Sequence, residues 1–144
     1  MSRKKDIASA FLGITVATIL WITILSREAL IGTPIRYQPF HSLISCLNEM
    51  QKGRVDANFF GNIILFIPVG FLFPIMTGNK KWYWTAGAGC SLSLLIEIIQ
   101  LISARGCFDL DDVILNIIGT VTGYSLLKLV EKLTLCRRRV KNVP

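Results

Sequence analysis

Acidic residues are concentrated between Ser93 and Gly119, although strongly apolar segments lie on both sides of that stretch. Carboxylates can act as general acids and bases, and with amide oxygens they can ligate a hard divalent cation. The residue types fit both chemistries, so enzymatic activity, a divalent-cation cofactor and the identity of any metal stay open. The candidate catalytic residues are Glu97, Asp109, Asp111 and Asp112.

Amides and arginines near these acids could bind a substrate, the arginines through an anionic head group. No histidine cluster for zinc, nucleophile elbow or phosphate-binding loop is present to narrow the chemistry. The candidate substrate-binding residues are Arg54, Asn58, Asn62, Gln100, Arg105 and Asn116.

A purely structural role is the alternative for the same residues. Asp109 could cap the helix that follows it, with Asp112 in the capping-box position. The asparagines could be hydrogen-bonding links between helices. Glu97 fits this alternative least well, because an acid inside a membrane span needs a partner or a proton, and Arg105 or Arg54 could pair with it.

The elements that position these residues are predicted to be membrane-spanning helices. The chain has 144 residues, of which 52% are hydrophobic, and a mean hydropathy of +0.54. That is more apolar surface than so short a soluble domain could bury. A spanning helix needs about 20 mostly apolar residues, and no segment alternates with the period of a barrel strand. We predict a single all-α membrane domain over residues 1–144, with spans at 7–25, 58–76, 82–102 and 110–130 and a basic cytoplasmic tail at 131–144.

The basic residues predict the orientation of these spans. Eleven Lys and Arg and two acids fall on the side of the termini, against five Lys and Arg and seven acids on the other side. The positive-inside rule therefore places both termini in the cytoplasm and the acidic segment outside. Because the basic residues lie at span ends and no nucleic-acid motif is present, we do not expect nucleic acid as a partner.

Helical spacing groups the polar residues into stripes at one level of the bundle. Glu97 and Asn116 each lie roughly 7 Å inside the outer end of a span, at a rise of about 1.5 Å per residue. Polar faces in lipid should turn inward, so we predict an outward-opening polar pocket beneath the outer loops. The stripes are Cys90, Ser93, Glu97 and Gln100; Asp109, Asp112, Asn116, Gly119 and Gly123; and Asn58 with Asn62.

A short amphipathic helix is predicted in the long outer loop, because apolar residues recur there at helical spacing. It would either lie on the outer membrane surface or cap the bundle. Cys46 of this helix and Cys107 both fall outside, and spacing alone leaves their pairing open. Its apolar residues are Phe40, Leu43, Ile44, Leu47 and Met50.

Three blocks together resemble the VanZ-like family of bacterial membrane proteins: "NFFGNIILFIPVGFLFP", "SLLIEIIQ" and "RGCFDLDDVILNIIGTVTG". The resemblance runs from about Tyr37 to Gly123. It departs at Arg36–Phe40, where this chain has "RYQPF" and many members have "NLIPF". The signature residues that match are Asn58, Asn62, Pro68, Gly70, Glu97, Gln100, Arg105, Asp109, Asp111, Asp112, Asn116 and Gly119.

The resemblance implies a small multi-pass protein of the bacterial cytoplasmic membrane and a role in low-level resistance to teicoplanin-type glycopeptides. The first hypothesis is that the acidic pocket binds or acts on an outer-leaflet amphiphile, with a membrane lipid, a lipid-linked cell-wall precursor or the glycopeptide as partner. The alternative is a non-enzymatic scaffold or accessory subunit for envelope proteins.

Overall fold

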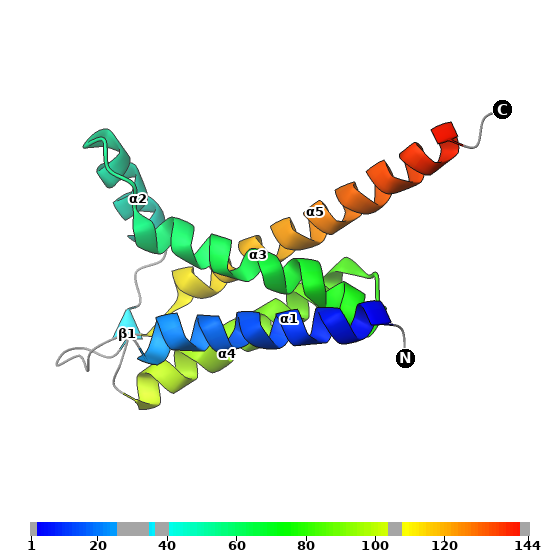
Figure 1. Cartoon of the computed structure of the whole chain (residues 1–144). Helices are drawn as coiled ribbons and strands as arrows, with labels where there is room; N and C mark the ends of the chain where they lie inside the picture. Colours follow the sequence, from blue (N-terminus) through cyan, green and yellow to red (C-terminus); the bar gives the residue numbers. More distant parts are fainter. Residues whose placement is uncertain (1–2, 26–34, 37–40, 104–107, 142–144) are drawn as a thin grey trace.

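The computed structural model is all-helical apart from one two-stranded ladder, and Figure 1 shows the arrangement. It describes residues 3–25, 35–36, 41–103 and 108–141. Helix α1 continues directly into the π-helical turn η1, and the ladder pairs β1 with β2 in parallel. The elements are α1 (Arg3–Leu20), η1 (Trp21–Leu25), β1 (Ile35–Arg36), α2 (His41–Gln51), α3 (Ala57–Thr77), α4 (Trp82–Ile102), β2 (Phe108–Asp109) and α5 (Leu110–Lys141).

Four helices of the described chain are long and apolar enough to cross a membrane, which confirms the predicted fold class. The span predicted at 82–102 coincides with α4, and the one at 58–76 lies within α3. The span at 7–25 is divided between α1 and η1. The span at 110–130 forms the first part of α5. The helix then continues to Lys141, through most of the predicted cytoplasmic tail.

Local signals explain where α3 begins and ends. Asp56 is its N-cap, and the Asp56 side chain accepts hydrogen bonds from the backbone N–H groups of Asn58 and Phe59 at 3.0 and 3.1 Å. At the other end Gly78 has φ of +76°, a left-handed conformation that glycine adopts without steric cost. The same turn leads into α4, so α3 and α4 form an antiparallel pair.

Helices α3 and α5 cross with their backbones in close contact. A Cβ atom at Gly119 would overlap the carbonyl of Ile63, and one at Gly123 would overlap the carbonyl of Ile67. This is the close approach that small residues permit between membrane helices. Gly119 and Gly123 therefore face another helix, and that helix is α3.

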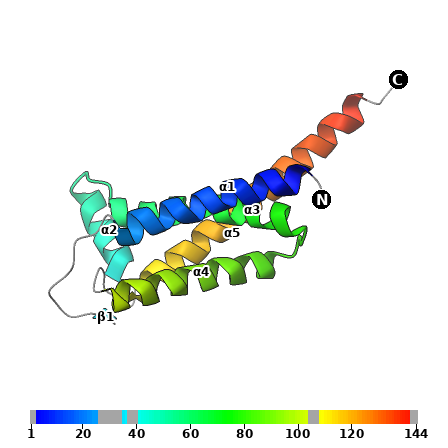
Figure 2. The same cartoon turned by 60° about the horizontal axis from the view of Figure 1, so that its bottom comes forward.

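The bundle has two chemically distinct ends, which Figures 1 and 2 place at opposite ends of the long helices. The loop end comprises η1, α2 and the ends of α3, α4 and α5 nearest Ala57, Ile102 and Leu110. The terminal end comprises the start of α1 and the α3–α4 turn, together with the part of α5 beside that turn. An apolar core of Ile19, Phe66, Val69 and Ile96 joins α1, α3 and α4 between the two ends.

The loop helix α2 confirms the predicted short amphipathic helix. It contacts α3 and α5 at the loop end (Figure 2). Its buried side carries Cys46, with Ser42, Ser45 and Glu49 half-buried around it. Three of its apolar residues, Ile44, Leu47 and Met50, are between 53% and 57% exposed, as expected for a helix at a membrane interface. Leu43 is 45% exposed and points toward α3 and α5.

Candidate functional site

Glu97 lies within the bundle at the loop end, and only 2% of the residue is exposed. Its Oε2 accepts a hydrogen bond of 2.9 Å from the backbone N–H of Asp109. Burial of a carboxylate is costly unless hydrogen bonds replace its water, and this bond is one such replacement. Glu97 thereby links α4 to the start of α5.

Asp109 caps α5, as the structural alternative from the sequence predicted. Its Oδ1 accepts a hydrogen bond of 3.0 Å from the backbone N–H of Asp111, two residues into the helical start. Side chains that bond the first free N–H groups of a helix in this way stabilise it by about 1 kcal/mol. The cap and the Glu97 bond together engage both the side chain and the backbone of Asp109.

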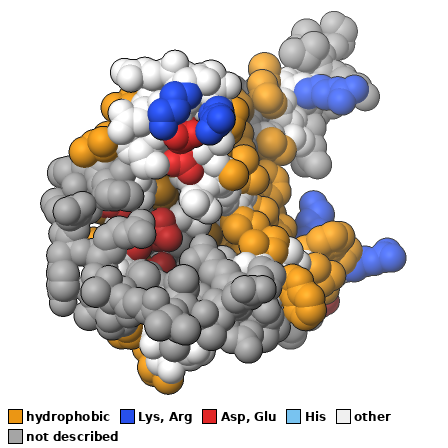
Figure 3. Space-filling model, turned by 90° about the vertical axis from the view of Figure 1, so that its left-hand side faces the viewer, with side chains coloured by type: hydrophobic (Ala, Val, Ile, Leu, Met, Phe, Trp, Pro, Cys, Tyr) orange, Lys and Arg blue, Asp and Glu red, His pale blue; other side chains and the backbone are white. Residues whose placement is uncertain are grey.

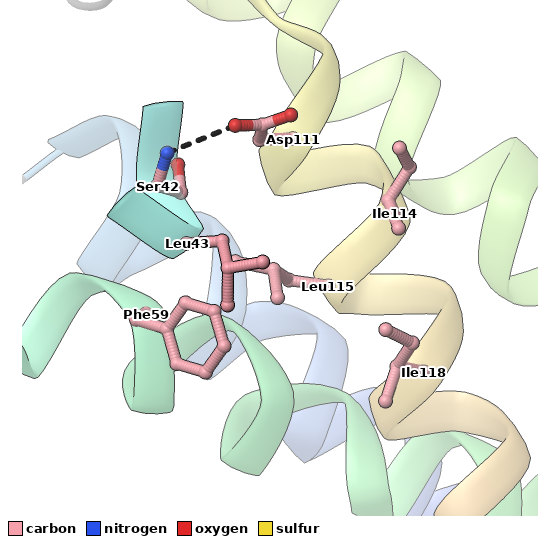
Figure 4. Close-up of a pocket in the computed structure, with 7 residues that line it drawn as sticks. All are labelled: Ser42, Leu43, Phe59, Asp111, Ile114, Leu115 and Ile118. Carbon is pink, nitrogen blue, oxygen red and sulfur yellow. Dashed lines mark hydrogen bonds between the residues drawn. The ribbon is translucent and has the colours of Figure 1, made fainter. Parts of the chain in front are cut away.

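Asp111 continues the chain of contacts into α2. Its Oδ2 accepts a hydrogen bond of 2.9 Å from the backbone N–H of Ser42, which is 69 residues away in sequence (Figure 4). Ser42 is in the first turn of α2, where N–H groups have no partner within the helix and a negative charge is favourable. Asp111 is therefore a long-range cap of α2.

These three carboxylates form one chain of contacts from α4 to α5 to α2. Asp112, which follows Asp111 in the sequence, is half-buried and also has a polar interaction. Figure 3 looks onto the loop end and shows acidic side chains recessed near the middle of that face. The structure thus brings Glu97, Asp109 and Asp111 together through backbone N–H groups.

The two predicted amides on α4 and α5 are buried as well. Gln100 donates from Nε2 to the carbonyl oxygen of Thr23 at 2.8 Å, which ties α4 to η1. Asn116 donates from Nδ2 to the Ser93 hydroxyl at 2.8 Å, which ties α5 to α4. Asn116 Oδ1 is buried and has no hydrogen-bond partner within the part of the chain that is described.

The predicted binding residues on and before α3 are less buried than those on α4 and α5. Asn58 and Arg54 are exposed near the start of α3, and Asn62 is half-buried one turn further along. Arg105 lies outside the described residues, as does Cys107, so the Glu97–Arg105 and Cys46–Cys107 pairings are not described. The stripe of Asn58 and Asn62 on α3 is therefore less buried than the polar stripes on α4 and α5.

A cavity of about 190 Å³ lies between α2, α3 and α5 at the loop end (Figure 4). Its wall is almost entirely apolar, and the polar residues at its edge are Asp111 and Ser42. The lining residues are Ser42, Leu43, Phe59, Asp111, Ile114, Leu115 and Ile118. Backbone N–H groups near the helix starts engage the described carboxylates, and apolar side chains line this cavity. The polar pocket predicted beneath the outer loops stays a prediction, because the loop residues 26–34, 37–40 and 104–107 lie outside the described residues.

Sequence reasoning missed two participants in this site, both of which act through backbone groups. The Ser42 N–H and the Thr23 carbonyl bind Asp111 and Gln100, and no side-chain pattern marks such groups. Among the described residues, no group of three or more His, Cys, Asp or Glu is arranged to hold a metal ion.

The fold and the loop-end site define a multi-pass, all-α membrane protein with a carboxylate-linked helical cap at one end. The chain belongs to the VanZ/LLP1 family, whose family model matches residues 8–131. It is similar to Protein VanZ of Enterococcus faecium, with 27% identity over 137 residues that cover 89% of this chain and 78% of that protein. No solved structure matches the chain significantly.

Proposed function

We propose that this protein lowers bacterial susceptibility to teicoplanin-type glycopeptides by binding or acting on an outer-leaflet amphiphile at its loop end. Membership of the VanZ/LLP1 family supports the resistance role. The observation that carries the mechanism is the apolar cavity with the Asp111 carboxylate at its edge (Figure 4). A cavity of this kind favours a ligand with an apolar chain and a polar head.

The ligand would be a membrane lipid, a lipid-linked cell-wall precursor or the glycopeptide itself. Its apolar part would contact Leu43, Phe59 and Ile118, and its polar head would lie near the Asp111 carboxylate at the cavity edge. Exposed Arg54, and Arg105, would engage an anionic head group. The acids that would hold or move a proton are Glu97, Asp109, Asp111 and Asp112.

The proposal requires the loop end to face outward, with both termini in the cytoplasm of a bacterium. Cys136 tests this orientation because it is exposed on α5. In cells kept reduced, an impermeant thiol reagent should label Cys136 only after lysis. Labelling of Cys136 in intact cells would contradict the orientation and, with it, the outward-facing cavity.

The acids can be tested with substitutions that nearly preserve shape. Glu97→Gln and Asp112→Asn keep hydrogen-bonding capacity but remove an ionisable carboxyl. If the carboxyls transfer protons or ligate a cation, activity should fall by about 10²-fold or more. Both variants should accumulate normally yet fail to restore reduced teicoplanin susceptibility in a deletion strain, whereas Asp6→Asn should behave as wild type.

The cavity can be tested separately from the acids. Ile114→Trp would fill the space that an amphiphile needs, and Ile98→Trp is its matched control on α4. Both isoleucines are 45% exposed, but only Ile114 lines the cavity. Ile114→Trp should abolish complementation while Ile98→Trp retains it, and equal behaviour of the two variants would argue against a ligand in this cavity.

The second candidate function is a scaffold or accessory subunit for other envelope proteins. It is favoured by a specific observation: Glu97, Asp109 and Asp111 each accept a backbone N–H and so stabilise helix starts. Neutral caps such as Asn serve nearly as well as Asp. Full complementation by Glu97→Gln and Asp112→Asn would therefore support the scaffold function and contradict a chemical role for these carboxyls.

A further inference from the structure

A second cavity, of about 240 Å³, opens at the terminal end of the bundle. It lies where the start of α1, the α3–α4 turn and α5 meet. Its floor is apolar, and its charged residues come from all three of these segments. The lining residues are Lys4, Lys5, Pro74, Ile75, Gly78, Lys80, Leu127 and Glu131.

Positive charge is in excess around this cavity. Lys80 pairs with Glu131 at 2.8 Å, and Lys128 pairs with the other oxygen of the same carboxylate at 3.2 Å. Glu131 is therefore already shared by two ammonium groups. Lys4 and Lys5 form no ion pair within the described part of the chain. An anion entering the cavity would meet two uncompensated lysines and a carboxylate whose charge is offset.

The position of Lys5 is set by the turn that ends α3. Its Nζ lies 3.0 Å from the point where a Cβ atom of Gly78 would be, so the glycine makes room for the ammonium group. Lys5 is half-buried, whereas Lys4 is exposed at the rim. Lys5 lines the cavity together with the apolar residues Pro74, Ile75 and Leu127, and its ammonium group can serve as a partner for an oxyanion.

The residues around the cavity are of the kinds that gather at the head-group layer of a membrane. Exposed Trp82, Tyr83 and Trp84 open α4 beside it, and such aromatic residues gather at the membrane–water interface. The Tyr124 hydroxyl donates to the Lys80 carbonyl at 2.6 Å, which fixes the turn at the same level on α5. Basic pockets at this level between spanning helices suit lipid phosphates.

We propose that this cavity binds the phosphate of an anionic phospholipid from the leaflet at the terminal end. Lys4 and Lys5 donate from Nζ to the phosphate oxygens, and the lipid glycerol and upper acyl chains contact Ile75 and Leu127. The apolar floor favours a lipid over a free phosphate ion. This site is independent of the loop-end cavity and of the proposed resistance function.

The test uses the purified full-length protein in detergent, where membrane orientation has no influence. Native mass spectrometry would compare retained phosphatidylglycerol with retained phosphatidylcholine. Wild type should retain phosphatidylglycerol preferentially, and the double variant Lys4→Gln/Lys5→Gln should lose about tenfold or more of that retention, since each lysine near an anionic head group contributes about 1 kcal/mol. The matched control, Lys132→Gln/Arg137→Gln, removes the same charge from exposed positions of α5 and should retain the lipid.

Several outcomes would overturn the proposal. Equal loss in the two double variants would indicate non-specific surface charge. Equal retention of both lipids by wild type would exclude recognition of the anionic head group. Inorganic phosphate that raises the denaturation temperature as much as phosphatidylglycerol does would assign the cavity to a free anion.

A wild-type measurement applies even if the double variant does not fold. A photoactivatable phosphatidylglycerol analogue should crosslink to peptides that contain Lys4 and Lys5 or the turn at Gly78–Lys80. Crosslinks confined to 132–137 of α5 would contradict the site.

Discussion

The two ends of the bundle use charge in opposite ways. At the loop end, Glu97, Asp109 and Asp111 are buried and accept backbone N–H groups. At the terminal end, Lys4 and Lys80 are exposed, and the ion pairs around Glu131 remain open to solvent. The loop end therefore uses its charges to hold α2, α4 and α5 together, while the terminal end keeps charge available for contact with other molecules.

The physical reason is the difference between the two kinds of side chain. A short carboxylate at a helix start lies next to N–H groups that have no helical partner, so a buried acid can be satisfied locally. A lysine has a long apolar stem and extends its charge to the interface. The buried acids Glu97, Asp109 and Asp111 of the loop end thus specify internal geometry, and lysines in the terminal end specify a surface.

The largest effect is expected at the helix crossing on which both ends depend. Gly119→Leu would force α5 away from the Ile63 carbonyl of α3, so the bundle should not assemble and the protein should not accumulate in membranes. Gly87→Leu is the control, since a Cβ at Gly87 meets nothing within 4 Å. Normal accumulation and thermal stability of Gly119→Leu would show that this crossing does not hold the two ends together.

A smaller effect is expected when one loop-end contact is removed. Asp111→Ala deletes the long-range cap of α2, and loss of such a cap costs about 1–2 kcal/mol. Opening of α2 should expose Cys46, which is 3% exposed, and accelerate its maleimide labelling about 5- to 30-fold.

This labelling is measured in detergent, in a background with Cys90, Cys107 and Cys136 replaced by Ala. Asp6→Ala and Lys4→Gln/Lys5→Gln at the terminal end should leave the Cys46 rate unchanged. An unchanged rate in Asp111→Ala would mean that the carboxylate does not hold α2 on the bundle. Buried acids at the loop end would then not differ from the exposed charges of the terminal end in their effect on structure.

The smallest effect is expected for the exposed ion pairs. Glu131→Gln removes the pairs with Lys80 and Lys128, but exposed pairs contribute only about 0–1 kcal/mol. The denaturation temperature in detergent should therefore change little, and retention of phosphatidylglycerol should rise because Lys80 is released. A large loss of stability would place Glu131 among the structural acids and remove the distinction between the ends.

The sequence by itself determined the membrane-spanning elements. Hydropathy reports which solvent each segment prefers, so α4 was predicted at 82–102 and α3 within one residue at each end. Helical spacing correctly paired Ser93 with Glu97 and Gln100 on one buried face, because that periodicity is a local property of the chain. The short helix α2 followed from the same periodicity.

The tertiary structure alone decided which groups meet. The bond from Ser42 to Asp111 and the parallel pairing of Arg36 with Asp109 join residues that are far apart in the sequence. Whether a carboxylate faces a cavity or a helix start depends on how the helices pack. Local sequence patterns carry no information about contacts between residues that are far apart in the sequence.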